Sequence, residues 1–470
     1  MKNNTYYLGI DLGTSAAKAV LQGCDGERLK ARCTYPTDTP DGWLAAVGSL
    51  VRELRSQAGR LADSPAISRI AAIGLSSQVG TYVIDGKEII SWQSDIGRAE
   101  LDEIKQSIPQ DDFLREIAMP HPDLISYPLP RLLYIQRRYG KDHEVLMPKE
   151  YLIRALTGQT VTDVFSMRGL ANPRTGRYAD ALLRHLGIEI ALPPLKRPTD
   201  LVGRITAEAA KRFGLEENTP VYLGCNDFFA GLLGMGIHTV GDTFELSGTS
   251  SHLGYLAEEI NREAFVSGEY FHGRCTYGPT KSSGPACDLA MREFGIDGID
   301  LRAVLAAKPP ICLPYLKGER APIFNEQARG VFFGLNEKTD KTALAYATLE
   351  GVIFSLYDIA QSMHMPAPKR LICGGGSAKN ELMNTLRATL FDCDMVGVEE
   401  NDTSALGACL LAMTGDGVYP TLAQAIADNV RYTAPTHPDP ALRETLLRRF
   451  ALYRRLYGDL KESFQIFNQL

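Results

Sequence analysis

The sequence has no uncharged apolar run as long as about 18 residues, and its opening MKNNTYYLGIDLGTS has no signal-peptide apolar core. We therefore expect no membrane-spanning segment and no export signal. It also lacks an excess of basic residues, because 50 Lys and Arg stand against 56 Asp and Glu, for a formal net charge of -6. This balance argues against a nucleic-acid or membrane-surface partner, since each favours a basic face.

Paired cysteines and clustered histidines are also missing. The nine cysteines are scattered singly, no two form a CxxC pair, and an odd number fits no closed disulfide framework. Such free thiols indicate a reducing compartment, so we expect a cytoplasmic protein. The eight histidines are dispersed, and no His or Cys group has metal-ligand spacing, which argues against a structural metal.

The length of 470 residues is too great for one hydrophobic core, so two domains are expected. Apolar periodicity and turn residues predict the elements of each. The predicted strands cover residues 6–10, 18–21, 70–75, 81–84, 221–224 and 370–373. The predicted helices cover residues 43–61, most of 95–158 with Gly158 as a C-cap, 230–236, 285–307, 338–364, 405–414 and 446–457.

A Gly-Thr-Ser turn after an apolar strand occurs twice, once near the start and once just past the middle. The first turn is Gly13-Thr14-Ser15 and the second is Gly248-Thr249-Ser250. Glycine lets backbone N–H groups converge on a phosphate, and the hydroxyls add donors. Alone, each is more often an ordinary hairpin, but two matched turns predict two similar domains that bind phosphate. The chain has no G-x-x-x-x-G-K-[ST] sequence, so it is not a P-loop protein.

Charged residues beside these motifs suggest phosphoryl-transfer chemistry. Asp11 could hold Mg²⁺ through water and Lys18 could reach a phosphate. Asp227 ends the apolar strand that contains residues 221–224, where functional acids of α/β proteins often lie. A carboxylate there can orient an attacking hydroxyl and accept its proton. The competing interpretation is that Asp227 simply caps the following helix.

The third motif is a strand that runs into Gly374-Gly375-Gly376 and reaches Asn380. Three residues without side chains would let a flat adenine lie on the backbone, with Asn380 bonded to an edge of the base. A tight strand-to-helix turn with Asn380 as a helix cap explains the same residues equally well.

With these motifs in this order, the sequence resembles the FGGY family of carbohydrate kinases, within the actin-like ATPase group, from end to end. The segments that carry the resemblance are Leu8–Ser15, Phe244–Ser250, Gly318–Pro322, Ala328–Leu335, Leu349–Gly351 and Gly374–Asn380. It implies an α/β fold with two actin-like (ribonuclease H-like) lobes, residues 1–237 and 238–470, around a central cleft for ATP and sugar.

The resemblance also implies an ATP- and Mg²⁺-dependent kinase with Asp227 as the catalytic base and Asp11 and Asp227 at the metal. The ATP-binding residues it implies are Gly13, Thr14, Ser15, Lys18, Gly248, Thr249, Ser250, Gly375, Gly376 and Asn380. The substrate-binding residues it implies are Gln78, Val79, Asp95, Arg98, Asn226 and Asp227.

Three departures from the family pattern concern the sugar site. The sugar strand has Gln78-Val79-Gly80-Thr81, where xylulokinase-like members carry Gln-Met-His-Gly and glycerol kinases carry Gln-Arg-Glu-Thr. The spacing from Asp95 to Arg98 is one residue longer than usual, and Phe228 replaces a polar residue. A less polar pocket suggests a substrate with fewer hydroxyls at one end, or one gripped differently.

The sequence therefore predicts phosphorylation of a small sugar or polyol. The frequency of ketose substrates among members of the family favours a ketose such as a pentulose or a heptulose. The alternative is a non-catalytic protein of the same fold that senses a sugar or a nucleotide, since fold does not fix function. The resemblance also allows a homodimer.

Overall fold

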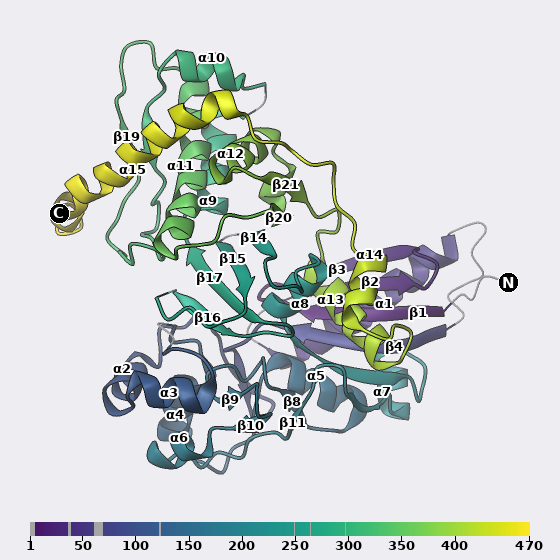
Figure 1. Ribbon diagram of the computed structural model, residues 1–470. Helices are drawn as coiled ribbons and strands as arrows, with labels where there is room; N and C mark the ends of the chain where they lie inside the picture. The colour runs from purple at the N-terminus through teal and green to yellow at the C-terminus, as the bar shows by residue number, and fades with distance from the viewer. Residues whose placement is uncertain are drawn as a thin grey trace. The chain divides into compact units, whose positions relative to one another are not determined.

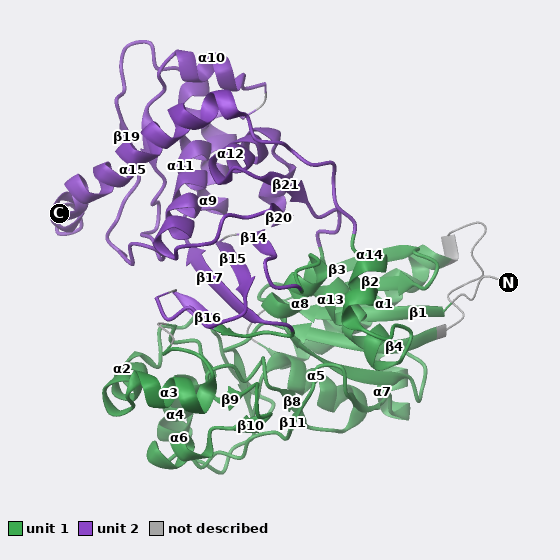
Figure 2. Cartoon of the chain, viewed as in Figure 1, with its two compact units in different colours: residues 1–238, 268–271, 402–430 green, residues 239–267, 272–401, 431–470 purple. Residues whose placement is uncertain are grey.

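The computed structural model describes residues 5–35, 39–60, 69–121, 124–248, 250–263, 265–296 and 298–470 (Figure 1). The chain forms two compact units (Figure 2). The first comprises residues 1–238, 268–271 and 402–430, and the second comprises residues 239–267, 272–401 and 431–470. The lobes 1–237 and 238–470 stay a prediction. The compact units differ from them in that residues 268–271 and 402–430 belong to the first unit.

A six-stranded sheet, in the order β12-β13-β4-β1-β2-β3, forms the centre of the first unit. Its strands are β1 (Thr5–Leu12), β2 (Ala16–Gly23), β3 (Arg28–Thr34), β4 (Arg69–Ser77), β12 (Leu201–Arg204) and β13 (Pro220–Asn226). β1 to β3 are antiparallel, as the hairpin prediction required, whereas β4 runs parallel to both β1 and β13. The register pairs Leu12 with Ser77 and Ser77 with Asn226, so the three strands end side by side.

Apolar side chains on one face of this sheet pack against α1 (Pro40–Arg60), through Trp43, Val47 and Leu50. α13 (Thr403–Gly415) contacts β1, β4 and α8 (Asp227–Gly234).

Glycine permits the close approach of α13 to its neighbours. A Cβ atom at Gly9 would lie 1.9 Å from the carbonyl oxygen of Ala405, and one at Gly74 would lie 1.9 Å from that of Ala408. A Cβ atom at Gly407 of α13 would lie 1.8 Å from the carbonyl oxygen of Ala230 in α8. Any larger residue would push the helix away from the sheet, so this packing depends on glycine on both sides.

The rest of the first unit is a mainly helical region with a second apolar core. The helices that contribute to this second core are α2 (Arg98–Ser107), α3 (Gln110–Ile117), α4 (Pro128–Tyr139) and α6 (Asp180–His185). α5 (Pro148–Thr157) and α7 (Ala207–Phe213) pack on the core of the sheet instead, and α14 (Leu422–Asn429) contacts α13. The short strands of this region are β5 (Tyr82–Ile84), β6 (Glu88–Ile90), β7 (Val145–Leu146), β8 (Thr162–Asp163), β9 (Ala171–Asn172), β10 (Arg177–Tyr178) and β11 (Leu195–Lys196). Gly158, at φ 74°, ends α5 as predicted.

The sheet of the second unit has the order β16-β17-β15-β14-β20-β21, in which the five strands from β17 to β21 repeat the arrangement of β3, β2, β1, β4 and β13. Its strands are β14 (Thr243–Ser247), β15 (Ser251–Ala257), β16 (Val266–Glu269), β17 (Arg274–Thr280), β20 (Arg370–Gly375) and β21 (Asp394–Gly397). β14 pairs antiparallel with β15 and parallel with β20, as β1 pairs with β2 and β4. The predicted second hairpin is thus confirmed.

Helices cover this second sheet and include one long apolar helix. They are α9 (Gly284–Leu289), a π-helical turn (Ala290–Phe294), α10 (Leu301–Ala306), α11 (Lys341–Ser362), α12 (Glu381–Phe391) and α15 (Pro440–Phe467), beside the strand pair β18 (Ile311–Leu313) and β19 (Val331–Phe333). α11 is long and apolar enough to cross a membrane, but 94% of its most apolar window is buried inside the structure. α15 packs on the same core through Leu446, Phe450 and Tyr453, as its predicted stripe indicated.

Candidate active site

The first predicted phosphate turn is held open and rigid by side chains around it. The backbone N–H of Gly13 donates to Ala16 O at 3.1 Å, and the hydroxyl of Tyr35 donates to Gly13 O. The indole Nε1 of Trp92 donates to the hydroxyl of Thr14 at 3.0 Å. Ser15 is exposed at the tip of the turn. The backbone groups of Gly13 are therefore used inside the protein, and Ser15 is the residue that the turn presents to solvent.

Two carboxyl groups lie at the carboxyl ends of the parallel strands beside this turn. Asp11, near the end of β1, is 5% exposed and accepts a 2.7 Å hydrogen bond from the hydroxyl of Ser76. Burial raises the pKa of Asp11, against the opposing effects of Ser76 and Lys18. Burial, together with the negative charge of Asp11, raises the pKa of Asp227 to about 8. The charge of Asp11 thus affects the ionisation of Asp227, as is common among groups of a functional site.

Asp227 is the first residue of α8, but Asn226 is the residue that caps the helix. The side-chain oxygen of Asn226 accepts the N–H of Phe229 at 2.8 Å, and its Nδ2 donates to Phe165 O at 3.0 Å. The interpretation of Asp227 as the cap is therefore wrong, although its Oδ1 does accept the N–H of Phe228 at 2.8 Å. Since both ends of the Asn226 amide are used inside the protein, its predicted contact with substrate stays a prediction.

Lys18, predicted to reach a phosphate, forms a 3.3 Å ion pair with Asp402, the residue before α13. The pair is partly exposed, with side-chain exposures of 32% and 20%. An exposed pair of this kind is weak enough for a phosphate to replace the carboxylate as the partner of Lys18.

Residues predicted to bind the acceptor differ in their surroundings. Gln78 is 5% exposed, and its Oε1 is buried without a hydrogen-bond partner among the described residues. Val79 is half-buried and packs on the helical core. Asp95 and Arg98 are both exposed, and Arg98 begins α2. An unpaired buried oxygen is costly, so Gln78 is the member of this set that most needs a ligand.

Arg131 was not predicted from the sequence, yet it supports the segment that carries Trp92 and Asp95. It is fully buried, and its guanidinium donates to Ser94 Oγ and Ser94 O at 2.8 Å each and to Trp92 O at 3.1 Å. In the sequence it is an arginine in a helical segment, indistinguishable from a surface residue.

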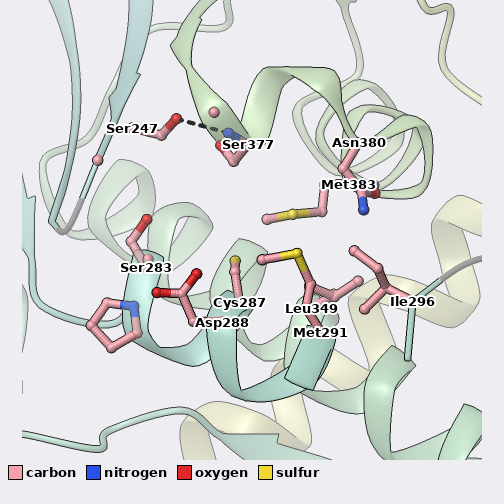
Figure 3. Close-up of a pocket in the computed structure, with 14 residues that line it drawn as sticks. Ser247, Ser283, Cys287, Asp288, Met291, Ile296, Leu349, Ser377, Asn380 and Met383 are labelled. Atoms are coloured by element: carbon pink, nitrogen blue, oxygen red, sulfur yellow. Dashed lines mark hydrogen bonds between the residues drawn. The ribbon is translucent and has the colours of Figure 1, made fainter. Parts of the chain in front are cut away.

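The second unit contains a cavity of about 380 Å³ beside the second hairpin (Figure 3). Its lining residues are Ser247, Gly248, Ser283, Gly284, Pro285, Cys287, Asp288, Met291, Ile296, Leu349, Gly376, Ser377, Asn380 and Met383. Three of the predicted ATP-binding residues, Gly248, Gly376 and Asn380, are among them. Ser250 and Gly375 are not, and Thr249 lies outside the described residues.

Figure 3 shows an uneven distribution of polar groups in this cavity. Ser247, Ser283 and Asp288 lie at one end, and Asn380 lies at the other with Ile296. Between them the wall is formed by side chains such as Met291 and Met383. The cavity thus suits a ligand with a hydroxyl-bearing end and a flat apolar part.

Asn380 does cap α12, which was the competing interpretation of the third motif. Its Oδ1 accepts the N–H of Met383 at 2.9 Å. Because it also lines the cavity, the two interpretations are compatible, and the Nδ2 group is the part of the amide that can donate to a ligand.

The glycine of the third motif that most needs to be glycine is Gly375. It has φ 90°, and a Cβ atom there would lie 1.9 Å from the carbonyl oxygen of Ser247. The hydroxyl of Ser247 donates to Gly374 O at 2.9 Å and accepts from Ser377 N at 3.3 Å. The second hairpin and the Gly-rich turn are therefore packed backbone to backbone.

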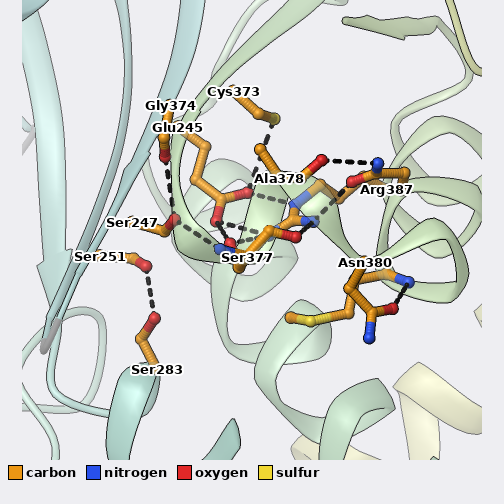
Figure 4. A network of polar contacts seen from close by, with 12 residues as sticks. Glu245, Ser247, Ser251, Ser283, Cys373, Gly374, Ser377, Ala378, Asn380 and Arg387 are labelled. Atoms are coloured by element: carbon orange, nitrogen blue, oxygen red, sulfur yellow. Dashed lines mark hydrogen bonds and ion pairs between the residues drawn. The ribbon is translucent and has the colours of Figure 1, made fainter. Parts of the chain in front are cut away.

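A buried ion pair fixes the same turn from behind (Figure 4). Arg387 and Glu245 are almost fully buried, and the guanidinium donates to both carboxylate oxygens, at 2.5 and 2.8 Å. Arg387 also donates to the hydroxyl of Ser377 at 2.6 Å and to Asn384 Oδ1 at 3.1 Å. The pair joins β14 to α12 and was not predicted from the sequence.

The similarity of the chain to known proteins agrees with this geometry. The N-terminal domain of the FGGY family of carbohydrate kinases matches residues 6–234, and the C-terminal domain matches residues 299–415. The chain belongs to the FGGY family of carbohydrate kinases. This FGGY chain is 26% identical to a xylulose kinase of Bacillus subtilis over 495 residues, covering 97% of each protein. It is equally similar, at 26% identity and 96% coverage of each protein, to a gluconokinase of the same organism.

Solved structures give the same result for the fold. The FGGY chain superposes on a gluconate kinase and on a ligand-bound xylulose kinase, both from Lactobacillus acidophilus, with a TM-score of 0.84 each. The sequence identities are 25% and 26%, and 98% of this chain is covered in each case, with 99% and 100% of the other chains. The fold is therefore the two-lobe actin-like fold, and the protein is an ATP-using sugar kinase.

Proposed function

We propose that the protein transfers the γ-phosphoryl group of ATP to a hydroxyl of a small ketose, with Asp227 as the general base. The observation that supports this most strongly is the pair of acids at the ends of β1 and β13, with the pKa of Asp227 raised to about 8. A base whose pKa lies near neutrality accepts a proton readily while still being partly ionised. In phosphoryl transfer such a carboxylate orients the attacking hydroxyl and takes its proton.

Asp11 and Asp227 would hold Mg²⁺. Two acids whose pKa values are raised gain from a nearby cation, and Mg²⁺ needs only one or two carboxylates besides water and phosphate oxygens. The absence of any cluster of three or more His, Cys, Asp or Glu residues among the described residues is compatible with this. When bound, the ion neutralises charge on the phosphates.

The nucleotide would bind in the cavity of the second unit. Asn380 donates from Nδ2 to a ring nitrogen of the base, since its Oδ1 is used by the N–H of Met383. The apolar wall covers the faces of the base. The second Gly-Thr-Ser turn, whose Gly248 lines this cavity, would lie beside the phosphates of the nucleotide.

The acceptor would bind in the first unit, with the unpaired Oε1 of Gln78 accepting one of its hydroxyls. Phe228, which is half-buried and follows Asp227 in the chain, would give this site a less polar wall. Similarity to xylulose kinases favours a ketopentose. A sugar acid is a second candidate, because a gluconokinase is equally similar.

The test is ADP release by the purified protein with Mg-ATP and each of a panel of ketoses, aldoses, polyols and aldonates. Asp227→Asn should lower turnover by about 10² to 10⁴-fold while ADP binding is retained. The matched control is Asp200→Asn, which removes a partly buried aspartate of the same unit whose partner is Arg197, at 3.0 Å. That variant should keep full activity.

Equal activity of Asp227→Asn and the wild type would exclude Asp227 as the base. If no acceptor stimulates turnover although ADP binds, the non-catalytic sensor becomes the better explanation. Stimulation by a sugar acid but by no ketose would identify the second candidate.

A further inference from the structure

Residues Glu319–Pro322, a Glu-Arg-x-Pro segment, carry part of the family resemblance and have no role in the proposed function. Its glutamate, Glu319, lies between β18 and β19 and is only 1% exposed. A buried carboxylate is costly unless hydrogen-bond donors surround it. The identity of those donors indicates what the residue does.

Five donors converge on Glu319. Its Oε1 accepts the backbone N–H groups of Lys281 and Arg320, at 2.5 and 2.7 Å. Its Oε2 accepts the hydroxyl of Thr280 at 2.7 Å, the N–H of Ser282 at 3.2 Å and the hydroxyl of Ser355 at 3.2 Å. Three of the five come from the consecutive residues 280–282. The carboxylate therefore fixes the path of the chain where β17 ends.

That stretch of chain leads directly into the wall of the nucleotide cavity. Ser283 and Gly284, the next two residues, line the cavity. The hydroxyl of Ser283 lies 2.6 Å from that of Ser251 on the second hairpin, and the N–H of Gly284 donates to Gly248 O at 3.2 Å. α9, which carries Asp288 into the cavity, begins here. A displacement of residues 281–284 would thus move the cavity wall relative to the hairpin.

We infer that Glu319 is a positioning residue for the nucleotide, holding residues 280–284 against the second phosphate hairpin. This inference rests on the proposed nucleotide site. Glu319 does not line the cavity, so it acts on the nucleotide only through this loop.

A carboxylate suits this role because it presents acceptors alone. Glutamine has the same shape, but an NH₂ group replaces one of the two carboxylate oxygens of glutamate. Whichever way the amide turns, that group faces a backbone N–H, either of Lys281 or of Ser282. Donor then faces donor, so the loop must shift even though the volume is unchanged.

The experiment compares Glu319→Gln with Glu350→Gln by calorimetric titration with ADP, which requires no knowledge of the sugar. Glu350 is a matched control because it is also fully buried in the second unit, but it accepts from Arg449 on α15, at 2.7 Å to each oxygen. Glu319→Gln should weaken ADP binding at least tenfold, and Glu350→Gln less than twofold even if its melting temperature falls further. With the acceptor known, KM for ATP should rise in Glu319→Gln while kcat changes little.

Equal effects of the two substitutions on ADP affinity would overturn the inference and leave the proposed function intact. If the wild-type protein itself binds no ADP, the proposed nucleotide site fails and the inference fails with it. Should Glu319→Gln not fold, Thr280→Val replaces it, since it removes a hydroxyl that donates to Glu319 and accepts from Ser282 N at 2.9 Å. Thr280→Val should weaken ADP binding and Thr280→Ser should restore it. Unchanged binding in Thr280→Val would refute the role of this contact.

Discussion

Replacing Arg387 by methionine tests whether the buried pair with Glu245 stabilises the second unit. Methionine fills much of the apolar volume of arginine, so the change removes charge and hydrogen bonds more than packing. It leaves the carboxylate of Glu245, which is 1% exposed, without its two guanidinium bonds. It also removes the bonds from Arg387 to Ser377 and Asn384.

The expected cost follows from burial. Removing one partner of a buried ion pair costs about 3–5 kcal/mol, because the other charge stays uncompensated. For a unit of this size, 1 kcal/mol lowers the melting temperature by roughly 2–4 °C, so a fall of about 6–20 °C is expected. The Gly-rich turn loses its anchor at the same time, so ADP should raise the melting temperature less than in the wild type.

Differential scanning calorimetry with and without ADP measures both effects. The control is Arg137→Met, because Arg137 makes the same two-pronged contact with Glu103, at 2.7 and 2.8 Å, with side chains 46% and 45% exposed. That variant should lose at most about 1 kcal/mol. A cost below about 1 kcal/mol for Arg387→Met, or equal costs in both variants, would refute the reasoning.

Three further predictions concern individual side chains. Because Asp227 must be ionised to accept a proton and its pKa is raised to about 8, kcat/KM should rise with pH up to that region. Asp11→Asn removes a charge that raises this pKa, so any residual activity should have its midpoint at lower pH; a midpoint that stays or rises contradicts the assignment. Burial also raises the pKa of Asp358 to about 6, so its stabilising contribution is greatest below its unfolded pKa of about 4 and is lost as pH rises through about 6. Asp358→Asn should therefore increase the free energy of unfolding in urea by about 1–3 kcal/mol at pH 8 and change it little at pH 4. Gly375→Ala places a Cβ atom 1.9 Å from Ser247 O at φ 90°, so it should lower the melting temperature and weaken ADP binding, and wild-type values in both assays would show that the turn adapts.

Local patterns were enough to predict the parts of the fold that are set by neighbouring residues. Both hairpins, the strand before Asp227 and the cap at Gly158 were predicted from apolar runs and turn residues. The cavity residues Gly248, Gly376 and Asn380 were found because glycine and asparagine carry positional meaning in turns and caps.

Contacts between distant residues could not be predicted in this way. Arg131 and the pair Glu245–Arg387 look like ordinary charged residues in the sequence, and only the folded chain shows that they are buried. Asn226 caps α8, although the sequence also allowed Asp227 to do so. Sequence alone could not choose between the two neighbours, because asparagine and aspartate are both good helix caps.

The position of α13 has a consequence for how the protein is made. During synthesis, the sheet that contains Gly9 and Gly74 leaves the ribosome long before the helix that covers it, because most of the second unit lies between them in the chain. The first unit therefore cannot finish folding as an independent N-terminal domain, although domains generally fold in the order of their synthesis. Until residues 402–430 arrive, that face of the sheet must remain uncovered, so premature termination within residues 239–401 leaves both units incomplete.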